Sequence, residues 1–222
     1  MWKTAPMLIL ASKSTARKSL LAGAGLRFEA SPAQIDGRAV EADVLGKGGD
    51  AVAVARRLAE VKALAVSANR LGDVVIGADQ VLAETDGPLP ASPTRGEVMG
   101  QLAASILHKP ESMATAAEQL DRLRGRTHYL HSGIALARDG RVLWSDVESA
   151  ALTMRDFSAA VRDSILALEG EAVLGSVGSY RLEGPSVRLF ERIEGDYFTI
   201  LGLPLLPLLA ALRLHAPDLL DE

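Results

Sequence analysis

Hydroxylic and basic side chains follow directly on an apolar run near the start of the chain. The apolar residues Leu8–Ala11 lead into the hydroxylic residues Ser12, Ser14 and Thr15, and Arg17 comes next within a helical pattern. A helix N-terminus presents backbone N–H groups and the positive end of the helix dipole, which together favour an anion. Hydroxyl groups add donors, and a guanidinium matches the geometry of a phosphate. The stretch predicts a phosphate site; a strand, an N-cap and a solvated Arg17 are the structural alternative.

A carboxylate follows a second apolar run. Asp79 comes after residues 74–78, which read Val-Val-Ile-Gly-Ala. A carboxylate near the end of a buried strand is costly unless it is paired or binds a metal. Strand ends are also where ligands sit in open α/β sheets. Asp79 is therefore a candidate metal ligand or general base, and a turn or helix-capping carboxylate is the alternative.

Two lysines extend this set of charged groups. Lys62 lies within a helical pattern, and Lys109 precedes Pro110 and a further helical pattern. Each lysine alone is typical of a solvated surface. Together with Arg17 and Asp79, they place three cations and one carboxylate near the ends of predicted elements. This set is what a polyphosphate with a metal ion requires, but spacing alone leaves open whether the four side chains converge.

The composition excludes several other chemistries. The 222 residues contain no Cys, which rules out disulfides, thiolate metal sites and a thiol nucleophile. The four histidines lack a zinc-type spacing such as His-Glu-x-x-His. The formal net charge of −4 argues against nucleic-acid binding. No Gly-x-x-x-x-Gly-Lys-Ser/Thr motif occurs, which argues against a P-loop kinase or ATPase.

The apolar runs are too short or too interrupted for a membrane protein. The N-terminal run is shorter than a signal peptide requires. The most apolar stretch, residues 198–214, is interrupted by Gly202, Pro204 and Pro207 and is shorter than a membrane span. We therefore expect a cytoplasmic protein without a membrane partner.

Helical and strand patterns alternate along the chain. Strands are predicted at residues 8–11, 26–30, 74–82, 128–137, 142–154, 179–183, 187–193 and 197–201. Helices are predicted at residues 15–24, 51–68, 111–123, 159–168 and from 204 onward, and residues 36–50 are predicted to form a loop. Residues 87–107 are predicted to be a loop insertion. The pattern indicates a single domain over residues 1–222, of α/β (mixed α+β) class, with a mixed sheet.

Short motifs run through the chain in a fixed order. They are Leu-Ala-Ser-x-Ser-x-x-Arg at 10–17, Leu-Leu at 20–21, Leu-Ala-x-x-Lys-Ala at 58–63, Gly-Ala-Asp at 77–79, Lys-Pro at 109–110, Leu-x-Gly-x-x-His at 123–128, Ile-x-Gly-x-Tyr at 193–197 and Gly-Leu-Pro at 202–204. In this order they resemble the Maf family of nucleoside triphosphate pyrophosphatases. Each motif is weak by itself, but the ordered set covers nearly the whole chain and is specific.

The resemblance implies hydrolysis of a nucleoside triphosphate between its α and β phosphates, which gives the monophosphate and pyrophosphate. It also implies a two-lobed fold of the Maf/ITPase type, with a central twisted mixed sheet and a cleft between the lobes. Carried over to this chain, Asp79 is the catalytic residue, as base toward water or as metal ligand. Ser12, Arg17, Lys62 and Lys109 would hold the triphosphate. The expected cation is Mg²⁺ or Mn²⁺, because the site offers oxygen ligands.

Three positions bear on which nucleotide is bound. In the branch of the family that acts on dTTP and UTP, Thr typically follows the Asp and Gln occupies the later position. Gln80 and Glu183 look more like the branch that acts on 7-methyl-GTP. A carboxylate suits the N1–H and N2–H₂ donors of guanine and attracts the positive methylated ring. Ala16, a further substrate-binding position, replaces the larger residue usual before Arg17 and leaves the shape of the base pocket open.

The chain also departs from the family pattern. Gly37 stands after Asp36 where the family usually has Asp-Glu, so a carboxylate often linked to metal binding is absent; Asp36 or Glu41 is the candidate replacement. Ser176-Val177-Gly178 stands where Lys-Ala-Gly is usual, which removes a cation. The carboxylate absent after Asp36 favours the alternative function, a nucleotide-responsive regulatory protein associated with cell division and with little catalysis. The retained Asp79, Lys62 and Lys109 favour the enzyme. The expected partner is a nucleoside triphosphate, and a homodimer is compatible with the sequence.

Overall fold

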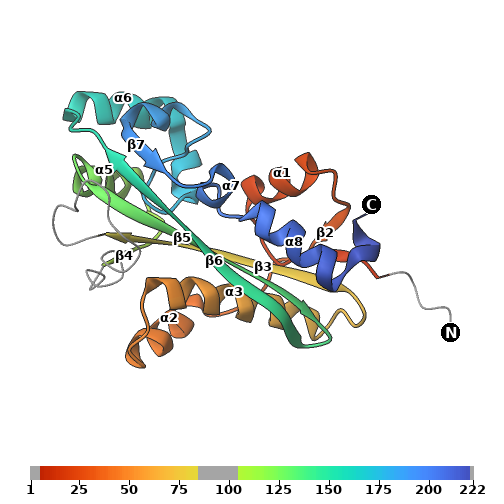
Figure 1. The fold of residues 1–222 in the computed structure, drawn as a ribbon. Coiled ribbons are helices and arrows are strands. Elements are labelled where there is room, and N and C mark those ends of the chain that lie inside the picture. Colours follow the sequence, from red (N-terminus) through yellow and green to blue (C-terminus); the bar gives the residue numbers. More distant parts are fainter. Residues whose placement is uncertain (1–5, 85–104, 221–222) are drawn as a thin grey trace. The chain divides into compact units, whose positions relative to one another are not determined.

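The computed structural model describes residues 6–84 and 105–220, which form a mixed α/β fold (Figure 1). The strands are β1 (Leu8–Leu10), β2 (Phe28–Ala30), β3 (Val74–Glu84), β4 (Ile106–Leu107), β5 (Thr127–Arg138), β6 (Arg141–Met154) and β7 (Phe190–Glu194). The helices are α1 (Thr15–Gly23), α2 (Gly37–Gly46), α3 (Ala51–Ser67), α5 (Met113–Leu123), α6 (Ala159–Glu169), α7 (Tyr197–Ile200) and α8 (Leu205–His215). Within these described ranges, 3₁₀ segments lie at Gly170–Gly175, Pro185–Leu189 and Pro217–Leu219. Among the helices of these described ranges, none has the length and apolar character needed to cross a membrane.

The strands form one mixed sheet, as the sequence predicted. Their order is β2-β1-β3-β5-β6-β7, and β4 pairs with β3 beside this path. β1 lies parallel to both β2 and β3, whereas β4 is antiparallel to β3 and β7 is antiparallel to β6. Mixed pairing follows from the connections, because a helix joins the parallel strands and a tight Asp139-Gly140 turn joins β5 to β6.

The chain divides into two compact units. Unit 1 comprises residues 1–80, 132–148 and 196–222, and unit 2 comprises residues 81–131 and 149–195. The long strands β3, β5 and β6 contribute residues to both units. Predicted site residues therefore belong to two different units.

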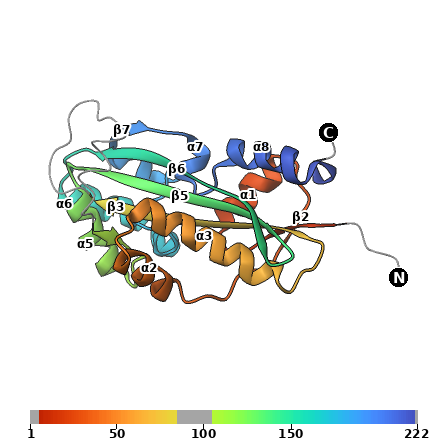
Figure 2. The same ribbon diagram turned by 60° about the horizontal axis from the view of Figure 1, so that its bottom comes forward.

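In unit 1 both faces of the sheet are covered. One face packs against α3, through Ile9, Ala11, Val75, Ala135, Ala137, Ala59, Ala63 and Val66. The other face packs against α1 and α8, through Leu8, Leu10, Val74, Ile76, Ala78, Ile134, Leu136, Leu21, Leu205, Leu208 and Leu212. Figures 1 and 2 both show α3 running along the strands and α1 lying beside α8. Because side chains alternate along a strand, odd-numbered residues of β3 in this unit face α3 and even-numbered residues face α1 and α8.

Two glycines let α3 lie close to the sheet. A Cβ at Gly77 would lie 2.1 Å from the carbonyl oxygen of Ala59. A Cβ at Gly133 would lie 2.1 Å from the carbonyl oxygen of Ala55. A side chain at either position would therefore push α3 away from the strands, and with it Lys62.

Unit 2 carries α5 and α6, each of which begins at a serine cap. The side chain of Ser112 accepts a hydrogen bond from the Thr115 N–H, and that of Ser158 accepts one from the Val161 N–H. These hydroxyls satisfy N–H groups that have no partner within the helix. The helix predicted at residues 159–168 is confirmed as α6, directly after its Ser158 cap.

Two predicted elements have the wrong type. Residues 36–50, predicted as a loop, contain the helix α2, because the glycines lie at its ends and Asp36 caps it by accepting from the Ala39 N–H at 3.0 Å. Residues 197–201, predicted as a strand, form the helix α7, because Asp196 accepts from the Thr199 N–H at 3.1 Å. The aromatic and β-branched composition of this segment suits a strand, but the cap sets a helical turn.

Three further predicted segments differ from the structure in type or in length. Residues 179–183 form no strand, because Gly178 and Ser179 have φ values of +80° and +61°, which a strand does not accommodate. In the predicted strand 187–193, only the part from Phe190 onward is β7. Of the predicted insertion at 87–107, Ile106 and Leu107 form β4 and pair with β3. Residues 85–104 lie outside the described residues.

Candidate functional site

The candidate site in unit 1 forms where β1 ends and β3 continues. Leu10 of β1 lies opposite Ile76 of β3, and the Ala11 N–H donates to the Ile76 carbonyl at 2.8 Å. The chain then turns into α1, so the next carbonyl along this edge of β3, that of Ala78, has no strand partner. The Arg17 guanidinium takes the place of that partner, because its Nη1 donates to the Ala78 carbonyl at 2.9 Å. A buried carbonyl needs such a donor, and Arg17 therefore closes the end of the β1–β3 pairing.

Arg17 also holds the segment between α7 and α8. Its Nε donates to the Gly202 carbonyl at 2.7 Å, and its Nη1 donates to the Ser12 hydroxyl at 3.1 Å. Gly202 has a φ of +87°, and a Cβ there would lie 3.2 Å from Nη2 of Arg17, so glycine suits both the backbone and the contact. Burial lowers the pKa of Arg17, and the negative charge of Asp79 opposes that shift. Among the described residues no acceptor binds Nη2.

The Ser12 hydroxyl is buried and preorganised by its neighbours. It accepts hydrogen bonds from the Ser14 N–H at 3.2 Å and from Nη1 of Arg17. Ser14 in turn caps α1 by accepting from the Arg17 N–H at 3.4 Å. Within the described ranges nothing accepts the Ser12 proton, so the hydroxyl beside the start of α1 has one donor that these residues do not use.

Lys62 and Asp79 meet on the α3 face of the sheet. Lys62 Nζ lies 2.7 Å from Asp79 Oδ1, and the two side chains are 22% and 20% exposed. The sequence predicted Asp79 near the end of its strand. Instead, β3 continues to Glu84 and pairs with β4 through Leu82. Lys62 likewise lies within α3 rather than at its end. What ends near Asp79 is the pairing of β3 with β1, and the Arg17 side chain follows β1 along this edge of β3.

Gln80 lies on the opposite face of the sheet from Asp79. Its Nε2 donates to the carbonyls of Thr199 at 3.1 Å and Ile200 at 2.9 Å, and to the Ser132 hydroxyl at 3.0 Å. The Ser132 hydroxyl donates to the same Thr199 carbonyl at 2.7 Å. The last carbonyls of a helix have no partner within it. Gln80 therefore ties α7 to β3 and β5, whereas its predicted part in nucleotide selection stays a prediction.

The structure brings four predicted residues together in unit 1, and two others belong to unit 2. Ser12, Arg17, Lys62 and Asp79 gather around the β1–β3 edge, and Ala16 is partly buried in the first turn of α1. Lys109 is exposed between β4 and α5 of unit 2.

Glu183, also in unit 2, is held by a neighbouring arginine. Its Oε1 accepts from Arg181 Nε at 3.3 Å, and its side chain is 35% exposed. Arg181 Nη1 also donates to Oε2 of Glu169, a fully buried carboxylate, at 3.3 Å. The predicted part of Glu183 in base recognition stays a prediction.

The described residues do not form a metal cage by themselves. In residues 6–84 and 105–220, no group of three His, Asp or Glu side chains could hold a metal ion. The two candidate replacements for a carboxylate at Gly37 have other partners, since Asp36 caps α2 and Glu41 lies 3.8 Å from Arg38. Mg²⁺ is often bound by one or two carboxylates together with substrate phosphates. Asp79 fits a cation only in that way, with a nucleotide supplying the other ligands.

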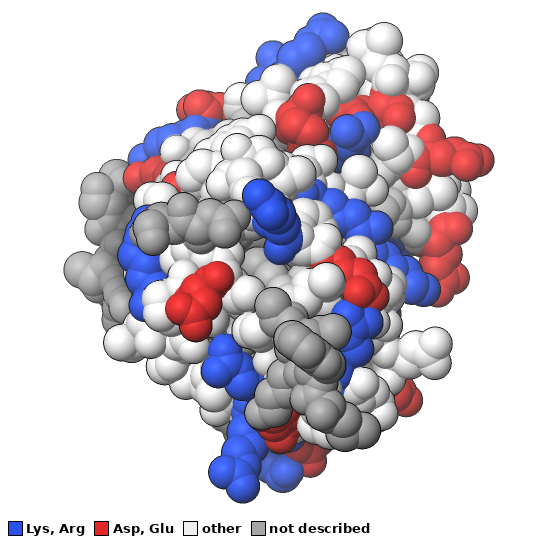
Figure 3. All heavy atoms as spheres, turned by 90° about the vertical axis from the view of Figure 1, so that its right-hand side faces the viewer, with Lys and Arg blue, Asp and Glu red and all other residues white. Residues whose placement is uncertain are grey.

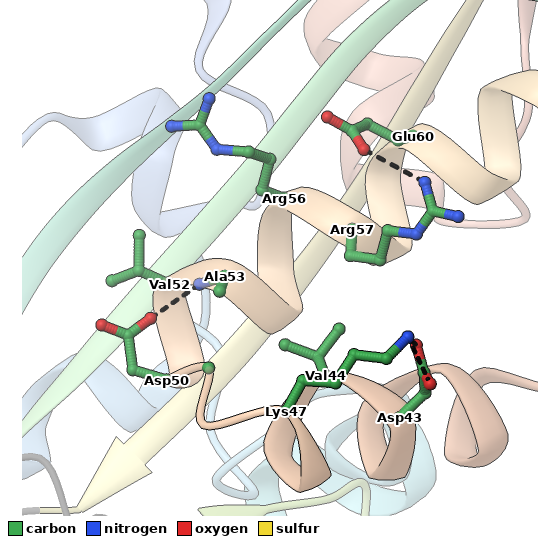
Figure 4. Close-up of a pocket in the computed structure, with 10 residues that line it drawn as sticks. Asp43, Val44, Lys47, Asp50, Val52, Ala53, Arg56, Arg57 and Glu60 are labelled. Carbon is green, nitrogen blue, oxygen red and sulfur yellow. Dashed lines mark hydrogen bonds and ion pairs between the residues drawn. The ribbon is translucent and has the colours of Figure 1, made fainter.

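A groove between α2 and α3 holds none of the predicted site residues (Figure 4). Its charged groups are largely engaged with one another. Lys47 pairs with Asp43 at 2.7 Å, Arg57 pairs with Glu60 at 3.3 Å, and Asp50 caps α3 by accepting from the Ala53 N–H at 2.8 Å.

Basic and acidic side chains are interspersed on the face drawn in Figure 3.

Several residues of the site have no signal in the sequence. Ser132 and Thr199 contact Gln80 only because β5 and α7 lie beside β3. Gly202 has a signal, since it belongs to the Gly-Leu-Pro motif, but its contact with Arg17 does not follow from spacing. In unit 2 the buried carboxylate of Glu169 likewise gains its role only from folding.

A match to a family model and similarity to named relatives show the family of this chain. The family model described as Maf-like protein matches residues 7–215, and the chain therefore belongs to the Maf family. Relatives of known name cover nearly the whole chain. A 7-methyl-GTP pyrophosphatase of Brucella abortus biovar 1 is 47% identical over 93% of this chain and 94% of its own length.

Two further relatives match the chain to a similar extent. A 7-methyl-GTP pyrophosphatase of Rhizobium etli is 48% identical over 94% of this chain and 96% of its own. A nucleoside triphosphate pyrophosphatase of Nitrobacter winogradskyi is 48% identical over 96% of this chain and 95% of its own.

Proposed function

We propose that this protein hydrolyses a nucleoside triphosphate between its α and β phosphates, releasing the monophosphate and pyrophosphate. The observation that carries the proposal is the Lys62–Asp79 pair at 2.7 Å beside the turn that holds Ser12 and Arg17. The names of relatives that are 47–48% identical over most of the chain support the same reaction.

The groups around the β1–α1 turn suit the triphosphate. The Ser12 hydroxyl, Nη2 of Arg17 and the N–H groups at the start of α1 are donors that need no large rearrangement to meet phosphate oxygens. Lys62 adds a positive charge on the α3 face of β3, next to Asp79. Donors fixed before the substrate arrives stabilise developing negative charge without the cost of reorganisation.

Asp79 is the group that we assign to the chemical step. Its carboxylate accepts a proton from the attacking water, and Lys62 holds the carboxylate in place through Oδ1. A divalent cation, Mg²⁺ or Mn²⁺, held by Asp79 and the nucleotide's phosphates would supply further charge neutralisation when bound. Replacing Lys62 therefore weakens both phosphate binding and the orientation of Asp79.

The finer proposal is that the nucleotide is 7-methyl-GTP. The relatives from Brucella abortus biovar 1 and Rhizobium etli carry that name. Glu183 is a partly exposed carboxylate that can accept hydrogen bonds from a guanine edge. Glu183→Gln should therefore lower kcat/KM for 7-methyl-GTP more than for UTP, and an equal loss for all nucleotides would remove Glu183 from base recognition.

A nucleotide-binding regulatory protein with little catalysis is the second candidate. The observation that favours it is the lack of a three-ligand metal group in the described ranges, together with Gly37 in place of a carboxylate. We further propose that the protein acts in the cytoplasm, where free nucleoside triphosphates occur, and that it needs neither nucleic acid nor membrane. A homodimer is compatible with this activity and is tested by the mass in solution.

The deciding experiment measures pyrophosphate release from 7-methyl-GTP, GTP, dTTP, UTP, CTP and ATP with Mg²⁺ or Mn²⁺. Asp79→Asn should reduce kcat at least about a hundredfold, the lower end for loss of a general base. Asp43→Asn is the matched control, because it removes the carboxylate of an exposed lysine pair of the same 2.7 Å length. Binding of nucleotide without pyrophosphate release under either metal would favour the regulatory candidate. Wild-type kcat in the folded Asp79→Asn variant would refute the assignment.

A further inference from the structure

A glutamine of α5 uses both ends of its side-chain amide inside unit 2. Gln119 Nε2 donates to the His108 carbonyl at 2.7 Å. Gln119 Oε1 accepts from the Ser179 hydroxyl at 2.6 Å. Gln119 is 8% exposed and Ser179 is fully buried, so water does not compete freely for either bond. Neither the family motifs nor the spacing of charges points to Gln119.

The two segments that Gln119 joins each carry a predicted substrate-binding residue. His108 directly precedes Lys109, the predicted triphosphate ligand. Ser179 precedes Glu183, the predicted base-recognition residue, by four positions. The two segments are distant in sequence, and Gln119 connects them by one rigid planar amide.

The segment from Ser179 to Ser186 is fixed at its other end as well. Glu169 Oε1 accepts from the Ser186 N–H at 2.9 Å and from the Ser186 hydroxyl at 2.8 Å, and Arg181 connects Glu169 to Glu183. A Cβ at Gly184 would lie 2.4 Å from Glu169 Oε1, so the loop passes close over this carboxylate. The loop that carries Glu183 is therefore held at both ends by buried polar groups.

The backbone conformation of Ser179 is unfavourable by itself, so another interaction must stabilise it. Its φ of +61° lies in the left-handed region, which costs a non-glycine residue energy. Glycine would fit this backbone conformation better, but only serine offers a hydroxyl to donate to Gln119 Oε1. The hydrogen bond therefore accounts for a serine in a conformation that favours glycine.

We propose that Gln119 is a positioning residue that sets the geometry of Lys109 and Glu183 together, so that triphosphate binding and base selection in this unit are coupled. The inference rests on the proposed function, since it takes Lys109 and Glu183 as ligands of the nucleotide. Gln119 does not contact the substrate itself. It acts through the backbone of the Lys109 segment and through the loop that ends at Ser186.

Gln119→Met tests both links at once, because methionine keeps the length and volume of the side chain and removes its donor and acceptor. We expect kcat/KM for 7-methyl-GTP to fall about tenfold, the effect of about 1.4 kcal/mol. The preference for 7-methyl-GTP over UTP should fall, and competitive inhibition by inorganic tripolyphosphate should weaken by several-fold. Glu118→Met, an exposed neighbour on the same helix, is the matched control and should change neither quantity.

Ser179→Gly separates the two links. It removes the bond to Gln119 Oε1, leaves the bond to His108 intact and relieves the positive φ, so it should fold. We expect it to lower the preference for 7-methyl-GTP as Gln119→Met does, while inhibition by tripolyphosphate stays at the wild-type value. A merely structural role for Gln119 would lower the melting temperature without changing nucleotide preference or tripolyphosphate inhibition.

The outcomes distinguish this inference from the proposed function. If the wild-type protein releases no pyrophosphate from any nucleotide, the proposed function fails, whatever the variants do. If the wild type is active and folded Gln119→Met keeps the wild-type nucleotide preference and tripolyphosphate inhibition, the coupling by Gln119 is overturned. Wild-type preference in Ser179→Gly with altered preference in Gln119→Met would also overturn the path through the loop.

Discussion

Replacing Arg17 by methionine should destabilise the protein by several kcal/mol, because Arg17 is the donor for two buried carbonyls. The Ala78 and Gly202 carbonyls accept from it at 2.9 Å and 2.7 Å. A buried acceptor left without a donor costs about 1–3 kcal/mol, so the loss of both amounts to about 2–6 kcal/mol. Methionine fills much of the space of the aliphatic stem, and the packing loss is therefore small by comparison.

The free energy of unfolding is measured by urea titration at pH 7, with thermal unfolding as the second assay. For a loss of about 4 kcal/mol the melting temperature should fall by about 8–16 °C in a chain of this size. Arg38→Met is the matched control, because that side chain is 62% exposed and pairs only at 3.8 Å; it should stay within about 0.5 kcal/mol of the wild type.

Arg17→Lys refines the test. It keeps the positive charge, but a single ammonium does not reproduce the fork that reaches Ala78, Gly202 and Ser12. We expect a stability between those of the wild type and Arg17→Met. If Arg17→Met is as stable as Arg38→Met, the reasoning that Arg17 closes the β1–β3 edge is wrong.

Three further predictions follow from the packing and the buried groups. Gly77→Ala places a Cβ 2.1 Å from the Ala59 carbonyl oxygen and should cost several kcal/mol and most of the activity, whereas Gly46→Ala, with no atom within 4 Å, should cost neither in the same urea and pyrophosphate assays. Burial lowers the pKa of His128 from about 6.5 in the unfolded chain to about 3 in the folded protein. As the pH falls below about 6.5, the unfolded chain therefore binds a proton at His128 that the folded protein does not, and the folded state loses stability. Between pH 6 and 5 the free energy of unfolding should therefore fall, and His128→Gln should reduce that fall by about 1 kcal/mol; an unchanged slope would contradict the assignment. Gln80→Leu should lower kcat equally for all nucleotides, because Gln80 ties α7 on the face opposite Asp79, and a selective loss for 7-methyl-GTP would place it in base recognition instead.

Local sequence signals were sufficient for most of the elements in unit 1. The apolar run at Leu8–Leu10 and the hydroxylic turn after it predict a strand followed by a capped helix, and both are present. The helix α3 also follows from composition, since good helix formers fill residues 51–67. Composition misled where a cap decided the outcome, as at Asp36 and Asp196. One side-chain hydrogen bond to a helix N-terminus outweighs a weak preference of the residues that follow.

The sequence by itself identified Ser12, Arg17, Lys62 and Asp79 as the candidate phosphate-binding and catalytic residues of unit 1, because their residue types and their order along the chain can be read directly from it. The tertiary structure decided what these groups do for one another. Strand alternation placed Asp79 toward Lys62 and Gln80 toward α7, on opposite faces of one strand. The end of β1 left the Ala78 carbonyl without a strand partner, and Arg17 took it. Such contacts join residues far apart in the chain, and only the packing of helices on a sheet brings them within hydrogen-bond distance.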